Sequence, residues 1–116
     1  MIRTFSLAAA AAALSTLALA AEPVSGDRIR TIVSGNTVEG SMADTGRYSE
    51  FYAYDGTIRG EGYTGDWSIE GDEMCFDYGE GPDCWQVGGD AEEVLWIKDG
   101  EVLGSGTVRP GNPNDY

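Results

Sequence analysis

Residues 65–78 read Gly-Asp-Trp-Ser-Ile-Glu-Gly-Asp-Glu-Met-Cys-Phe-Asp-Tyr, and this stretch carries the clearest secondary-structure signal in the chain. The dipeptide Gly71-Asp72 separates two short segments, 67–69 and 74–76, that are rich in aromatic and apolar residues. A glycine at the first central position of a two-residue loop is typical of a type II′ β-hairpin. The stretch therefore predicts two antiparallel strands joined by a tight turn.

Two Asp-Gly dipeptides extend this pattern along the chain. Asp55-Gly56 separates segments 51–54 and 57–59, and Asp99-Gly100 separates segments 95–98 and 101–103. Each predicts a two-residue type I′ hairpin, whose central residues both need a positive φ. We expect eight short strands, near 36–43, 47–54, 57–63, 65–70, 73–78, 83–88, 93–98 and 101–108. Because the connections are short, the pattern predicts an all-β antiparallel meander, closed or nearly closed into a small barrel.

One segment before the strands has helical spacing. Ile29, Ile32 and Val33 recur at i, i+3 and i+4, Ser25 is a suitable N-cap, and Gly35 is a suitable C′ residue. A strand is also compatible with residues 28–34, and we favour one short helix.

The first twenty residues have the pattern of a secretory signal peptide. Met1-Ile2-Arg3 gives a positive start, residues 5–19 are an apolar run, and Ala18-Leu19-Ala20 supplies small residues for cleavage after Ala20 or Ala21. We therefore predict a signal peptide at 1–20 and a single domain at 21–116. The mature protein is expected to be a periplasmic or secreted monomer with no stable membrane insertion after cleavage.

The two cysteines are interpreted in that setting. Cys75 and Cys84 flank a turn-rich loop, and in an exported protein they predict a disulfide. Strand alternation puts Met74 and Phe76 on the face opposite Cys75, so the bond should cross the hairpin on its outer face.

The same alternation predicts the core. The predicted core residues are Val38, Phe51, Ile58, Trp67, Ile69, Phe76, Trp85, Val87, Leu95, Ile97 and Val102. Three tryptophans are many for so short a chain, and they either fill the barrel or line an apolar ligand cavity. For such a cavity we name Phe51, Trp67, Phe76 and Trp85.

Charge and composition exclude several functions. The chain has 20 acidic and 7 basic residues, a net charge of −13 and no histidine. This charge repels nucleic acid, and without histidine the Ser-His-Asp, Cys-His and His-based zinc sites are excluded. Carboxylate pairs such as Asp72-Glu73 lie in predicted turns, so we predict no catalytic residues and no enzyme.

Calcium is the metal that the acidic residues would suit best. The loop from Asp77 through Glu80 to Asp83 is acidic but lacks the EF-hand pattern. We therefore interpret it as a plain acidic hairpin loop, and we predict no metal site and no cofactor.

Several strings in the mature chain carry a family resemblance. They are Ser-Gly-Asn-Thr-Val-Glu-Gly at 34–40, Gly-Asp-Trp-Ser-Ile-Glu-Gly-Asp at 65–72, Cys75-Phe76, Cys84-Trp85 and Gly111-Asn112-Pro113. Together they resemble a group of small uncharacterised secreted proteins of Gram-negative bacteria. The resemblance implies a periplasmic or secreted single domain and assigns no functional residues.

A looser resemblance concerns architecture alone. The expected barrel is similar to lipocalin-like barrels and to periplasmic inhibitors of secreted metalloproteases. Such inhibitors insert an N-terminal segment into the protease, which here would be Glu22-Pro23-Val24-Ser25. The sequence favours a non-catalytic binding domain for a small apolar molecule or an envelope partner. The alternatives are a protease inhibitor and, less favoured, a carboxylate-based hydrolase.

Overall fold

An N-terminal helix and eight strands make up residues 22–116, the part of the chain that this computed structural model describes. The predicted signal peptide lies outside the described residues. The elements are α1 (Gly26–Val33), β1 (Asn36–Met42), β2 (Gly46–Tyr52), β3 (Thr57–Gly60), β4 (Tyr63–Glu70), β5 (Glu73–Asp77), β6 (Asp83–Gly89), β7 (Glu93–Lys98) and β8 (Glu101–Pro110).

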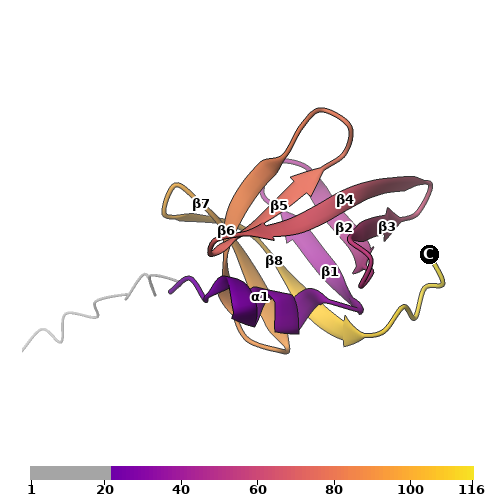
Figure 1. Cartoon of the computed structure of the whole chain (residues 1–116), viewed down its shortest axis with the longest axis horizontal. Helices are drawn as coiled ribbons and strands as arrows, with labels where there is room; N and C mark the ends of the chain where they lie inside the picture. Colours follow the sequence, from indigo (N-terminus) through magenta and orange to yellow (C-terminus); the bar gives the residue numbers. More distant parts are fainter. Residues whose placement is uncertain (1–21) are drawn as a thin grey trace, which may run out of the picture.

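The eight strands form one closed antiparallel barrel in sequence order (Figure 1). Each strand pairs with the next, and β1 closes the barrel against β8 over seven residue pairs, from Asn36–Pro110 to Met42–Gly104. Closure joins the first and last strands, and the weakest seam lies between β2 and β3, which pair only at Phe51–Arg59 and Tyr52–Ile58. The predicted all-β closed meander with one short helix is confirmed.

Helix α1 closes one end of the barrel. The Ser25 hydroxyl accepts a hydrogen bond from the Arg28 amide at 3.2 Å, which caps the helix start. Ile29, Ile32 and Val33 are at most 2% exposed and pack with the barrel core, and the helix lies beneath the strands in Figure 1. The prediction of a helix at this position is therefore confirmed.

A glycine allows α1 to approach the β4–β5 turn closely. A Cβ on Gly26 would lie 2.0 Å from the carbonyl oxygen of Gly71, which is far inside contact distance. The Gly26 amide also donates to Asp72 Oδ1 at 2.8 Å. These contacts fix the helix at the end of the barrel that holds the β4–β5 turn.

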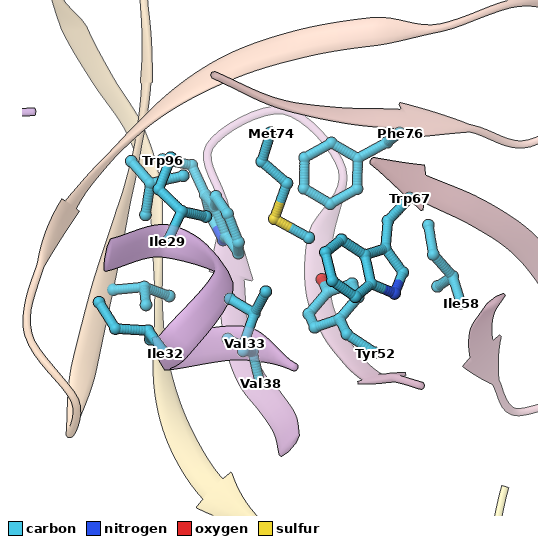
Figure 2. Close-up of a cluster of buried hydrophobic side chains, with 12 residues drawn as sticks. Ile29, Ile32, Val33, Val38, Tyr52, Ile58, Trp67, Met74, Phe76 and Trp96 are labelled. Atoms are coloured by element: carbon cyan, nitrogen blue, oxygen red, sulfur yellow. The ribbon is translucent and has the colours of Figure 1, made fainter. Parts of the chain in front are cut away.

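The barrel core gathers around the buried side of α1. Figure 2 shows Ile29, Ile32 and Val33 of the helix together with Val38, Trp67 and Met74 of the strands. Edge-to-face aromatic contacts continue the cluster, with ring centroids 6.4 Å apart for Tyr52 and Trp67 and 6.1 Å apart for Tyr52 and Phe76.

The predicted disulfide is present. Cys75 and Cys84 are direct cross-strand partners on β5 and β6 and form the bond. Their strand neighbours Met74 and Phe76 belong to the core cluster, so alternation puts the bond on the opposite face of the sheet, where Cys75 is still only 2% exposed. A disulfide fits an oxidising, exported location.

Two of the three predicted hairpin turns have the expected form. Asp99 and Gly100 both have positive φ, 50° and 78°, as a type I′ turn requires. Gly71 has a φ of 60° in a two-residue loop, which agrees with the predicted type II′ turn.

The prediction for Asp55-Gly56 is wrong, because the Ala53 amide donates to the Thr57 carbonyl at 2.9 Å and closes a loop of three residues, 54–56. Only Gly56 has a positive φ, and its amide donates to the Ala53 carbonyl, as in a type I turn followed by a left-handed residue. Tyr52 therefore pairs with Ile58, and a two-residue loop would instead have placed Ala53 there. This one-residue difference reverses which face of β2 points inward.

The core prediction changes accordingly. Tyr52 is 1% exposed and belongs to the core, whereas Phe51 lies on the other face and is not in the cluster. Val102, also predicted as core, is 44% exposed on β8. On β7 the buried positions include Val94 and Trp96, and the predicted Leu95 is half-buried between them.

Most of the remaining core predictions agree with the structure. Val38, Ile58, Trp67, Phe76, Val87 and Ile97 are buried, and Ile69 and Trp85 are partly buried against the cluster.

Candidate functional site

A cavity of about 430 Å³ lies inside the barrel, toward the end opposite α1. Asp44 and Thr45 of the β1–β2 loop, Tyr63 at the start of β4, and Tyr78 and Asp83 around the β5–β6 loop contribute to its wall. In an up-and-down barrel these loops gather at one end, and the β4–β5 turn that contacts α1 lies at the other. The helix thus closes one end while the cavity opens at the other.

Aromatic side chains dominate the wall of the cavity. The aromatic lining residues are Tyr48, Tyr63, Phe76, Tyr78, Trp85 and Trp96. Met42, Thr45 and the three acidic residues Asp44, Glu50 and Asp83 complete the lining. Phe76 and Trp96 also belong to the buried core, with ring centroids 5.4 Å apart, so they form the floor between core and cavity.

The central polar group of the cavity is the carboxylate of Glu50. Glu50 lies on β2 between Tyr48 and Tyr52 and is only 6% exposed. The Tyr52 hydroxyl donates to Oε1 at 2.8 Å, and the Tyr63 hydroxyl donates to Oε2 at 2.7 Å. The Tyr78 hydroxyl lies 2.8 Å from Oε2 and 3.0 Å from Oε1. Three phenols from three strand regions therefore converge on one buried carboxylate.

The tyrosines around Glu50 resist ionisation. Burial raises the pKa of Tyr52 well above its usual value, and the adjacent charge of Glu50 raises it further. Burial, followed by interaction with Glu50, also raises the pKa of Tyr63 and of Tyr78. Burial raises the pKa of Tyr48 to about 12, although the hydrogen bond from Trp96 acts to lower it. Because these phenols remain protonated, they act as hydrogen-bond donors toward the carboxylate.

Glycines make room for two of these tyrosines. A Cβ on Gly60 would lie 2.3 Å from the Tyr63 ring, and a Cβ on Gly65 would lie 2.8 Å from the Tyr78 ring. Both rings therefore lie across the backbone of neighbouring strand residues. The centroids of the two rings are 6.2 Å apart in an edge-to-face arrangement beside Glu50.

A second polar chain fixes the opposite wall. The Trp96 indole donates to the Tyr48 hydroxyl oxygen at 2.7 Å, and the Tyr48 hydroxyl donates to the Ser105 carbonyl at 2.9 Å. A Cβ on Gly106 would lie 2.3 Å from that hydroxyl, so glycine is required there for Tyr48 to hold this position. Two large aromatic side chains are thereby held in one orientation.

Of the ion pairs within residues 22–116, one involves a residue that lines the cavity, and it lies at the rim. Lys98 Nζ donates to Asp83 Oδ1, and this contact lowers the pKa of Asp83. The same ammonium lies 4.9 Å from the centroid of the Trp85 ring, within cation–π range. The Trp85 indole in turn donates to Asp83 at 3.0 Å.

Two of the four residues named from the sequence as cavity candidates line the cavity, and two do not. Phe76 and Trp85 line the cavity. Trp67 lies deeper, in the core beside α1, where its indole donates to the Ala53 carbonyl at 3.0 Å. Phe51 lies on the outward face of β2 and is not among the lining residues.

The residues named from sequence for the cavity did not include Glu50 or any of the four tyrosines of the site, although strand alternation put Tyr78 on the inward face with Phe76. The alternation of Tyr48, Glu50 and Tyr52 along one strand was an available signal. Alternation puts Tyr48, Glu50 and Tyr52 together on the face of the strand opposite Phe51. Because Glu50 is charged and stands in the middle of that face, the face was not expected to point into the barrel.

Residues 22–116 contain no group of three or more His, Cys, Asp or Glu side chains placed to hold a metal ion. Over the same residues, no helix has the length and hydropathy needed to cross a membrane.

Comparison with known proteins gives no match. A scan against protein-family models found no matching family, and searches of the curated proteins and of the solved structures found no similar protein.

Proposed function

We propose that this protein is an exported, non-catalytic binding domain that takes a small, largely apolar ligand into the open end of its barrel. The single observation behind the proposal is the aromatic cavity of about 430 Å³ above a floor of Phe76 and Trp96. Small-molecule sites in proteins are typically apolar concavities of roughly 300–1,000 Å³ with a few placed polar groups.

The rigidity of the walls supports binding by a preformed site. The Trp96–Tyr48–Ser105 chain and the convergence of tyrosines on Glu50 hold the lining side chains in place before any ligand arrives. Less conformational freedom is then lost on association, which favours affinity. The disulfide across β5 and β6 restrains the segment that carries Phe76 and Trp85.

The other hypotheses have less support. Val24 donates its amide to the Val87 carbonyl at 2.8 Å and packs against the core, so part of the segment that an inhibitor would insert is held on β6. A carboxylate-based hydrolase needs an acid free to exchange a proton with substrate. The oxygens of Glu50 instead accept hydrogen bonds from three phenols.

Titration of the mature protein with the neutral fluorescent dye N-phenylnaphthylamine tests the proposal. We expect saturable binding to one site, and Trp85→Ala should weaken it roughly tenfold, since that change removes an aromatic wall. The matched control is Tyr54→Ala, because Tyr54 is 84% exposed and lies in the loop at the closed end. No saturable binding, or equal binding by both variants, would contradict the proposed site.

A further inference from the structure

The charges of the cavity are unbalanced. Three lining residues are acidic, Asp44, Glu50 and Asp83, and none is Lys or Arg. Asp83 is paired with Lys98 at the rim, and the other ion pairs within residues 22–116 involve neither Asp44 nor Glu50. The interior of the cavity therefore presents negative charge to a ligand, with Glu50 as its buried member.

Glu50 is hydrogen-bonded but has no countercharge. Buried carboxylates in proteins are generally paired with a cation or bound to a metal, because leaving water is costly for an isolated charge. Here the partners are three neutral phenols. The Tyr78 hydroxyl lies within hydrogen-bond distance of both Glu50 oxygens but has one proton to donate, so three phenol protons serve the roughly four acceptor positions of the carboxylate. The position next to Glu50 thus suits a group that is positively charged.

The walls favour an organic cation over a metal ion. Calcium takes six to eight oxygen ligands, and magnesium takes about six in octahedral geometry. The cavity offers aromatic faces around one buried carboxylate instead. Aromatic rings attract ammonium groups, and Lys98 already occupies such a position against Trp85 at the rim. An ammonium ion attached to an apolar body matches both the charge and the lining.

We propose that the ligand of this cavity is an organic ammonium ion with an apolar body. The ammonium group lies beside Glu50, and the body packs among Phe76, Trp85 and Trp96. This inference rests on the proposed function, because it names the chemical class of ligand for the same cavity.

Three probes that share one apolar body test the inference on the wild-type protein. They are phenylbutylammonium, the neutral phenylbutanol and the anionic phenylbutyrate, titrated by calorimetry at neutral pH. We expect the ammonium probe to bind roughly tenfold or more tightly than the alcohol, and the carboxylate to bind most weakly. The affinity advantage of the ammonium probe over the alcohol should decrease as salt concentration rises. The decrease measures the contribution of the exposed Asp44, because salt screens exposed charges more than buried ones.

A pair of variants locates the effect. Glu50→Gln removes the charge and keeps the shape, so it should remove most of the preference for the ammonium probe over the alcohol, measured as the ratio of the two affinities in the same variant. Glu73→Gln is the matched control, since Glu73 is exposed at the β4–β5 turn on the closed end, and it should keep the full preference. If Glu50→Gln fails to fold, the wild-type ranking of the three probes is still a complete test.

Each pattern of binding has a distinct meaning. The alcohol binding as tightly as the ammonium ion would overturn the cation assignment and leave small-ligand binding intact. Phenylbutyrate binding most tightly would also overturn it, because the cavity would then accept an anion. Failure of all three probes, together with failure of the neutral dye, would overturn the proposed function itself.

Discussion

The contact between Tyr52 and Glu50 can be measured directly through Tyr52→Phe. The Tyr52 side chain is 1% exposed, and its hydroxyl donates to Glu50 Oε1 at 2.8 Å. Phenylalanine keeps the ring contacts with Trp67 and Phe76, so the substitution removes the hydroxyl and little else. A hydrogen bond to a charged group contributes about 1.5–3 kcal/mol, and the free energy of unfolding should fall by that amount.

Urea unfolding followed by tryptophan fluorescence is the assay. With a slope of about 1–3 kcal/mol per molar urea, the midpoint should fall by roughly 0.5–3 M with the slope unchanged. Tyr54→Phe is the control, because its side chain is 84% exposed and the change should stay within about 0.5 kcal/mol. In a Glu50→Gln background the hydrogen bond is neutral, so the loss from Tyr52→Phe should shrink to about 0.5–1.5 kcal/mol.

Two results would refute this reasoning. One is a Tyr52→Phe variant as stable as Tyr54→Phe, which would mean that the hydroxyl contributes nothing. The other is a loss of the same size with and without the charge on Glu50, which would assign the effect to packing.

Three further predictions concern the fold around the site. The Cys75–Cys84 bond closes a loop with a sequence separation of 9. In the chain-entropy relation, reducing this bond should lower the free energy of unfolding by about 2.6 kcal/mol, which urea midpoints with and without reductant measure. Gly106→Ala should lower stability by about 1–3 kcal/mol in the same assay and displace the Tyr48 ring, because the added Cβ meets its hydroxyl. Stability should fall as pH rises above about 10, since unfolded tyrosines ionise there while Tyr48, with a pKa of about 12, and Tyr52 stay protonated when folded. Urea midpoints between about pH 8 and 12 test this, and Tyr52→Phe should flatten the decline.

The hairpins show how far local sequence can determine the fold. At Asp99-Gly100 and Gly71-Asp72 the dipeptide specified both the turn and the pairing, because the required backbone angles suit few other residues. The capped helix and the disulfide pairing also followed from local spacing. Strand count, order and antiparallel pairing could be predicted, since short connections leave few alternatives.

The Asp55-Gly56 turn shows where the local signal was insufficient. The same dipeptide can form a two-residue loop or part of a three-residue loop, and the two forms differ by one residue of register. Phe51 faces inward in the first form, and Tyr52 does so in the second. The observed register puts Tyr52 beside Ile58 in the core.

The site depended on that register and on contacts between distant strands. An all-β chain with a capped helix, tight turns and a cross-strand disulfide could be predicted from the sequence, because these features depend on residues close together in the chain. The inward orientation of Glu50, and its hydrogen bonds from Tyr63 and Tyr78, 13 and 28 residues away, depend on the folded barrel. A buried carboxylate is favourable only when its partners are already in place, and closure of the barrel is what brings those partners together.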